Sequence, residues 1–130
     1  MLKQALIVAL MIFANFAYAE DYFLEIEKTC SSEGSQLVFE CKAVKSERHM
    51  IFSENGAWYG KNTSSVRQLK VVLNDANILV LENPVLFSGT DTIHIIKGTS
   101  KFYWSQFAYS DLLHQSEATV RYGSVIKVVK

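Results

Sequence analysis

Apolar and polar residues alternate with a period of two along most of the chain after residue 19. Leu24 and Ile26 alternate with Glu25 and Glu27, and similar alternation recurs at 37–44. These segments are rich in Val, Ile, Thr and aromatic residues, a composition typical of β-strands. Further strands are predicted at 49–54, 57–59, 66–73, 78–81, 92–97, 101–109, 119–122 and 125–129.

Turn-forming residues separate these strands, as at 55–56, 74–77 and 98–100. Eight to ten short strands with frequent turns predict an all-β fold. The fold is either a single antiparallel β-sandwich or a small eight-to-ten-stranded β-barrel, and the pattern leaves both open. The one helix candidate, at 110–115, would have Ser110 as its N-cap.

The first nineteen residues have the layout of a cleaved signal peptide. Lys3 supplies a positive charge, residues 5–14 are all apolar, and Ala17-Tyr18-Ala19 fits a cleavage site. The apolar run is shorter than the ~20 residues that a membrane-spanning helix needs. We therefore expect a signal peptide at 1–19 and a single all-β domain at 20–130. The mature protein is then expected to be periplasmic or secreted, with no membrane span.

Charge excludes two classes of partner. The chain has 13 basic and 13 acidic residues, and removing Lys3 with the leader leaves a net charge of −1. Such a balance provides no basic surface for nucleic acid or for an anionic membrane.

Cys30 and Cys41 are the only cysteines, and in an oxidising compartment such a pair normally forms a disulfide. A tight turn centred on Glu33-Gly34 would leave them too far apart to bridge. Either residues 31–40 form a wider connection and the disulfide forms, or the cysteines stay reduced. A metal site is a third alternative, but no histidines stand at ligand spacing.

No motif of the sequence enforces catalysis, so we predict no catalytic residues, no metal site and no cofactor. Ser88, Asp91 and His94 could be combined into a catalytic set, but no G-x-S-x-G motif supports it. A metal site built from His94, Asp111 and His114 lacks any ligand motif in the same way.

Aromatic residues are concentrated in one predicted strand, at 101–109. Alternation sends Phe102 and Trp104 to one face, and Tyr103, Phe107 and Tyr109 to the other. One face must be core, and the other is an aromatic stripe that is either covered by protein, lines a cavity or forms a binding surface. Trp58 and Tyr59, between Gly56 and Gly60, would add an aromatic loop to such a surface.

The C-terminal third resembles a group of small exported proteobacterial β proteins of unknown function. Their pattern is I-x-I-[ND]-R-x-T-G-x-F followed by G-x-C-x-K, and residues 93–102 and 123–127 read IHIIKGTSKF and GSVIK. The residues that match are Ile93, Ile95, Thr99, Phe102, Gly123 and Lys127. The late cysteine of the pattern is Val125 here, and Cys30 would take its role. The resemblance implies a small exported β protein and no particular activity.

These observations together predict an exported, non-enzymatic binding protein of the cell envelope. Its partner would be another protein, as for an inhibitor or an immunity protein, bound by Tyr103, Phe107, Tyr109, Trp58 and Tyr59. One alternative is a lipocalin-like barrel that carries a small apolar ligand. Another is a hydrolase of envelope polymers.

Overall fold

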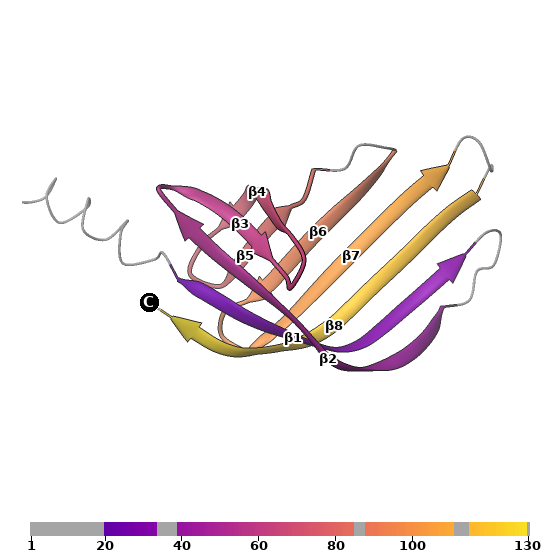
Figure 1. The fold of residues 1–130 in the computed structure, drawn as a ribbon, viewed down its shortest axis with the longest axis horizontal. Helices are drawn as coiled ribbons and strands as arrows, with labels where there is room; N and C mark the ends of the chain where they lie inside the picture. The colour runs from indigo at the N-terminus through magenta and orange to yellow at the C-terminus, as the bar shows by residue number, and fades with distance from the viewer. Residues whose placement is uncertain (1–19, 34–38, 85–87, 111–114, 130) are drawn as a thin grey trace, which may run out of the picture.

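A computed structural model describes residues 20–33, 39–84, 88–110 and 115–129. The described residues form eight strands and no helix, so the all-β prediction is confirmed (Figure 1). The strands are β1 (Asp21–Glu33), β2 (Glu40–Glu54), β3 (Ala57–Lys61), β4 (Val66–Asn74), β5 (Ile78–Glu82), β6 (Gly89–Ile96), β7 (Lys101–Ser110) and β8 (Gln115–Val129).

The strands close into a barrel, which decides between the two predicted architectures. Each strand pairs antiparallel with the next along the chain, and β8 pairs with β1 from Asp21↔Val129 to Glu33↔Glu117. The last strand therefore returns to the first, whereas the part of β2 before Met50 projects beyond β3 and has no paired strand on that side among the described residues.

Four predicted strands are joined in pairs into two long ones. Segments 37–44 and 49–54 contribute to β2, and 119–122 and 125–129 form β8. Gly123, which stands between two of the predicted strands, lies inside β8, and only glycine fits there because a side chain would collide with its neighbours. A Cβ at this position would stand 2.0 Å from the Glu25 carbonyl oxygen and 2.5 Å from the Phe102 ring. The glycine thus allows the Phe102 ring to lie directly on the backbone of β8.

The helix predicted at 110–115 is not supported at its ends. Ser110 is the last residue of β7 and Gln115 is the first of β8, where the two pair with each other. Residues 111–114 lie outside the described residues.

The barrel wall is much taller on one side than on the other. Strands β1, β2, β7 and β8 have 13, 15, 10 and 15 residues, whereas β3 and β5 have five each. The long strands project together past the short ones at one end, to the right in Figure 1. We call this end, where β1 leads into β2 and β7 into β8, the open end.

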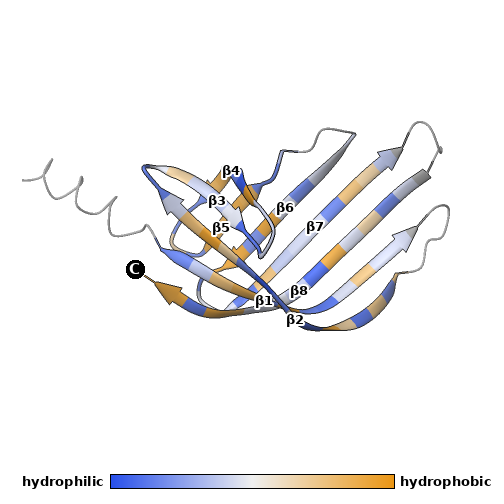
Figure 2. Cartoon of the chain, viewed as in Figure 1, coloured by the Kyte–Doolittle hydropathy of each residue, from blue (hydrophilic) through white to orange (hydrophobic). Residues whose placement is uncertain are grey.

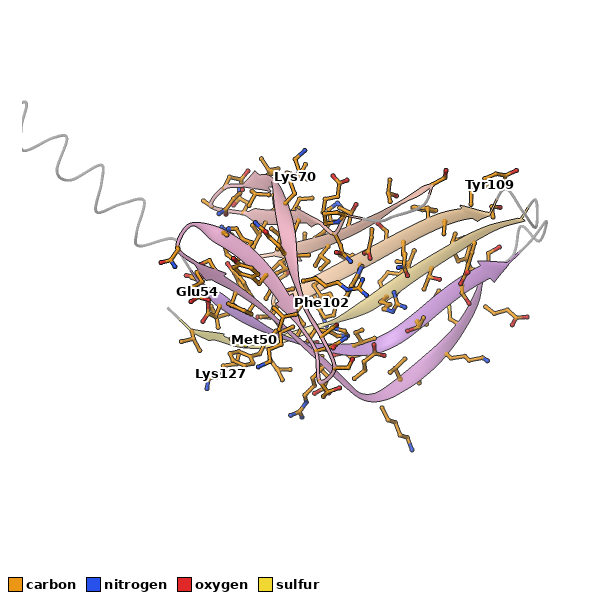
Figure 3. All side chains as sticks on the ribbon, turned by 45° about the horizontal axis from the view of Figure 1, so that its top comes forward. Met50, Glu54, Lys70, Phe102, Tyr109 and Lys127 are labelled. Atoms are coloured by element: carbon orange, nitrogen blue, oxygen red, sulfur yellow. A yellow bond between two sulfur atoms is a disulfide. The ribbon has the colours of Figure 1, made fainter. Side chains whose placement is uncertain are left out.

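The opposite end is filled by a hydrophobic core. Inward side chains from several strands pack there with almost no exposure, among them Phe102 at 0%, which lies inside the barrel in Figure 3. Hydropathy along the ribbon shows the same division, with orange segments concentrated in the short-strand half (Figure 2). The main buried members are Tyr22, Leu24, Ile26, Trp58, Leu79, Leu81, Ile95 and Phe102.

The predicted disulfide is present, with Cys30 on β1 directly opposite Cys41 on β2 and their Cα atoms 4.0 Å apart. This pairing rules out the tight turn centred on Glu33-Gly34 and confirms the wider connection. The bridge fits an oxidising compartment. The proposed leader at 1–19 lies outside the described residues. None of the described residues belongs to a helix that is long and apolar enough to span a bilayer.

Candidate functional site

A cavity of about 240 Å³ occupies the open half of the barrel. Its walls are residues of six strands and of the connections next to β3, β4 and β5, and its floor is formed by Ile51, Leu69 and Ile93, at the top of the core. Gly60 on β3 also lines it, and the missing side chain leaves space between the methyl groups of Ile51 and Leu69.

The cavity arises because inward residues change from apolar to polar along several strands toward the open end. On β6 the inward series runs from Ile95 and Ile93 to Asp91. On β7 it runs from Phe102 through Trp104 to Gln106. Since the pairing aligns these series across the wall, the polar side chains meet at one level of the barrel.

Asp91 is the centre of this polar level, and only 2% of it is exposed. Its Oδ2 accepts hydrogen bonds from Asn83 Nδ2 at 3.1 Å and Gln106 Nε2 at 3.3 Å, and its Oδ1 accepts one from Trp104 Nε1. The Asn83 amide N–H also donates to the Asp91 carbonyl, at 2.8 Å. Three side-chain donors therefore satisfy a buried carboxylate that has no ion-pair partner among the described residues.

Arg121 on β8 lies directly opposite Trp104 on β7. Its guanidinium carbon stands 5.6 Å from the centre of the Trp104 ring, in a cation–π arrangement. Its Nη1 donates to Gln106 Oε1 at 3.3 Å. Because Gln106 Nε2 is occupied by Asp91, its oxygen is directed at Arg121, and the buried carboxylate thereby fixes the position of the arginine.

His49 and Glu47 of β2 complete the opposite wall. The His49 ring meets the Trp104 ring edge-on, with centroids 4.9 Å apart, and His49 Nε2 lies 3.1 Å from Glu47 Oε1. The imidazole side chain is 11% exposed and the carboxylate 45%, so Glu47 lies nearer the solvent. This wall presents a carboxylate and an imidazole to the cavity.

The predicted aromatic stripe lies on the outer surface of β7, away from the cavity. Tyr103, Phe107 and Tyr109 are 44%, 49% and 43% exposed, and Figure 3 shows Tyr109 near the projecting end of the wall. Tyr122 of β8 joins them, its ring edge-to-face with that of Tyr103 at 5.4 Å. We call these four residues the outer aromatic stripe.

Trp58 and Tyr59 do not form the predicted loop beside the stripe. Both belong to β3, where Trp58 is only 7% exposed and packs in the core. Tyr59 points the other way and stacks on Phe52 of β2, with ring centroids 5.4 Å apart. The short apolar strand between two glycines places one ring inside the barrel and one outside it.

The alternative chemical sites do not assemble among the described residues. Asp91 faces into the barrel, whereas His94 follows the alternate, outward face and pairs with Tyr103, so the two do not meet. The described parts of the chain also contain no cluster of three His, Cys, Asp or Glu that could hold a metal ion. Asp111 and His114 lie outside the described residues.

Sequence reasoning missed Asp91, Gln106 and Arg121 as a group. Each is a polar residue at an inward position of a strand whose other inward residues are apolar. These polar residues can be recognised in the sequence, but the strand register that brings the three together cannot. No family model matches the chain, and comparison with curated proteins and with solved structures finds no match either.

Proposed function

We propose that this chain is a non-enzymatic binding protein that holds a small molecule in the cavity at the open end of its barrel. The observation that carries the proposal is the cavity itself, with an apolar floor and a wall of polar side chains held by Asp91. Binding sites for small molecules are typically concave, with a few fixed polar groups on an apolar lining. An exported protein with this site would act as a carrier or scavenger of its ligand.

The carboxylate in the site supports binding rather than catalysis. Both oxygens of Asp91 accept hydrogen bonds from side-chain donors, so the group holds its neighbours in position. The sequence analysis considered a lipocalin-like carrier of a small apolar ligand. The cavity lining favours a ligand that also has polar groups, because a purely apolar ligand would leave the polar wall without hydrogen-bond partners.

Filling the cavity provides a direct test. The variant Gly60→Val places a side chain between Ile51 and Leu69, where a Cβ has contacts of 3.4 Å or more. Gly98→Val is the matched control, because a Cβ at Gly98 has nothing within 4 Å. A fragment library would be screened by ligand-observed NMR against all three proteins, after circular dichroism has verified their folding.

We expect fragments that bind the wild type and Gly98→Val and that fail to bind Gly60→Val. Native mass spectrometry of the purified full-length product adds a second readout, because a retained ligand appears as extra mass that is lost on denaturation. A wild-type protein that retains no ligand and binds no fragment would refute the proposal.

The outer aromatic stripe favours a second function, the capture of a protein partner. Three aromatic side chains that lie more than 40% exposed on one strand are typical of recognition surfaces, where Tyr and Phe give large contact areas at low entropic cost. A photo-reactive amino acid at position 107 should then cross-link to one defined protein in the producing cell. The same probe at Glu54, an exposed residue at the opposite end of β2, should not.

A further inference from the structure

The charged residues that line the cavity are unequally neutralised. Arg67 and Arg121 lie at inward positions and are cationic, and neither has a carboxylate within 4.0 Å among the described residues. Asp91 is surrounded by three donors, and Glu47 is bonded to His49. The cavity therefore contains positive charge without a partner, whereas its negative charges already have hydrogen-bond donors.

Arg121 is the better positioned of these two cations. Trp104 supports one face of its guanidinium and Gln106 accepts one of its N–H bonds. A guanidinium has five N–H donors, and those of Arg121 other than the one bonded to Gln106 make no hydrogen bond to the described residues. Since its two supports are themselves fixed by Asp91, the group is held in place before any ligand arrives. A preorganised planar donor of this kind fits a carboxylate, which it can bind through two parallel hydrogen bonds.

The two acids set an upper limit on the charge of the ligand. Asp91 and Glu47 also line the cavity, so a dianion such as a phosphate monoester would be repelled by two carboxylates. A single negative charge can pair with Arg67 and Arg121, which have no carboxylate partner among the described residues, while Asp91 and Glu47 already accept hydrogen bonds. The floor of Ile51, Leu69 and Ile93 provides apolar surface for the rest of the ligand.

We infer that the cavity takes a small amphipathic monocarboxylate, with its carboxylate on Arg121 and Arg67 and its apolar body on the floor. This inference rests on the proposed function, since it names the class of ligand that the same cavity binds. It excludes a neutral apolar ligand of similar size as the preferred occupant, because such a ligand would leave the arginines unpaired.

Three probes of matched size test the charge preference: hexanoate, 1-hexanol and hexylamine. Binding would be measured by isothermal titration calorimetry and by tryptophan fluorescence in a Trp58→Phe background, where Trp104, which lines the cavity, is the one tryptophan left. We expect hexanoate to bind the wild type at least about tenfold more tightly than 1-hexanol, since hydrogen bonds to charged groups contribute roughly this much. Hexylamine should bind more weakly than either.

Arginine variants then test the residues. Arg121→Gln and Arg67→Gln should each lower hexanoate affinity about tenfold and leave 1-hexanol affinity unchanged. Arg67 is exposed, so Arg67→Gln tests the inference even if Arg121→Gln is poorly folded. Arg48→Gln is the matched control, because Arg48 pairs with Glu25 outside the cavity and its side chain is 69% exposed.

The outcomes separate the inference from the proposed function. If 1-hexanol or hexylamine binds as tightly as hexanoate, or if the arginine variants keep the preference, the inference is wrong and the cavity remains a binding site. If none of the three probes binds, the inference is wrong, and if fragments fail as well, the proposed function is also wrong.

Discussion

Replacing Asp91 by Asn tests whether the buried carboxylate organises the open half of the barrel. The substitution preserves shape but replaces one acceptor oxygen by an NH₂ group that only donates. If the NH₂ takes the place of Oδ1, it faces the Trp104 N–H, and a donor is left without an acceptor. If it takes the place of Oδ2, it faces two donors, from Asn83 and Gln106.

The first orientation is the less damaging, and its cost can be worked from the structure. One buried donor without a partner costs about 1–3 kcal/mol, and two hydrogen bonds that lose their ionic acceptor weaken by roughly 0.5–1 kcal/mol each. The free energy of unfolding should therefore fall by about 2–5 kcal/mol. Because Asp91 is 2% exposed, solvent cannot replace the lost acceptor.

Urea denaturation followed by circular dichroism and tryptophan fluorescence measures this change. Glu54→Gln makes the same carboxylate-to-amide change at an exposed position and should alter stability by less than about 0.5 kcal/mol. In a Trp104→Phe background the unpaired donor is absent, so Asp91→Asn should cost about 1 kcal/mol less there. A cost for Asp91→Asn no larger than that of Glu54→Gln would refute the reasoning.

Three further predictions concern the rest of the barrel. Replacing Cys30 and Cys41 by Ala should lower the free energy of unfolding by about 3 kcal/mol, from the entropy of the released loop; a loss below about 1 kcal/mol in urea would contradict this. Burial, with Glu20 as a smaller cause, raises the pKa of Tyr22 above its ordinary 10.0, so the unfolded chain loses this proton first. Stability should then fall as pH rises above 10, by up to about 1.4 kcal/mol per pH unit, and Tyr22→Phe should remove this component in pH-dependent denaturation. Gly123→Ala should lower the unfolding free energy by at least about 2 kcal/mol, whereas Gly98→Ala, which points into open space, should not in the same assay.

The strands were predictable because one side of the wall is buried and the other is not. Alternation placed Ile93 and Ile95 inward and His94 outward, as the structure has them. The hairpin turn at Asn55-Gly56 was equally predictable from the sequence, because asparagine and glycine readily adopt its two positive φ angles, 53° and 80°. Local signals of this kind require no knowledge of which strands pair.

The merging of strands and the make-up of the site depended on long-range contacts instead. A glycine such as Gly123 interrupts the strand pattern in the sequence. The Phe102 ring packed against it explains why a glycine is needed within the strand. Trp58 was expected in an aromatic loop of the binding surface, although 57–59 was also predicted to be a strand. Closure of the barrel buries that strand's inner face, and Trp58 with it. The grouping of Asp91 with Arg121 likewise depends on register across three strands, which no local pattern specifies.

The pairing of β1 with β8 has a consequence for how the connectivity of the chain can be changed. Asp21 pairs with Val129, so the two ends of the barrel wall already stand where a hairpin turn would join them. A short linker there would turn the barrel into a continuous ring of hairpins. The chain could then be cut elsewhere, for example at the exposed turn around Gly98, to give a circular permutant in which β7 comes first. Such a permutant would keep every strand pair while changing the order in which the ribosome delivers them.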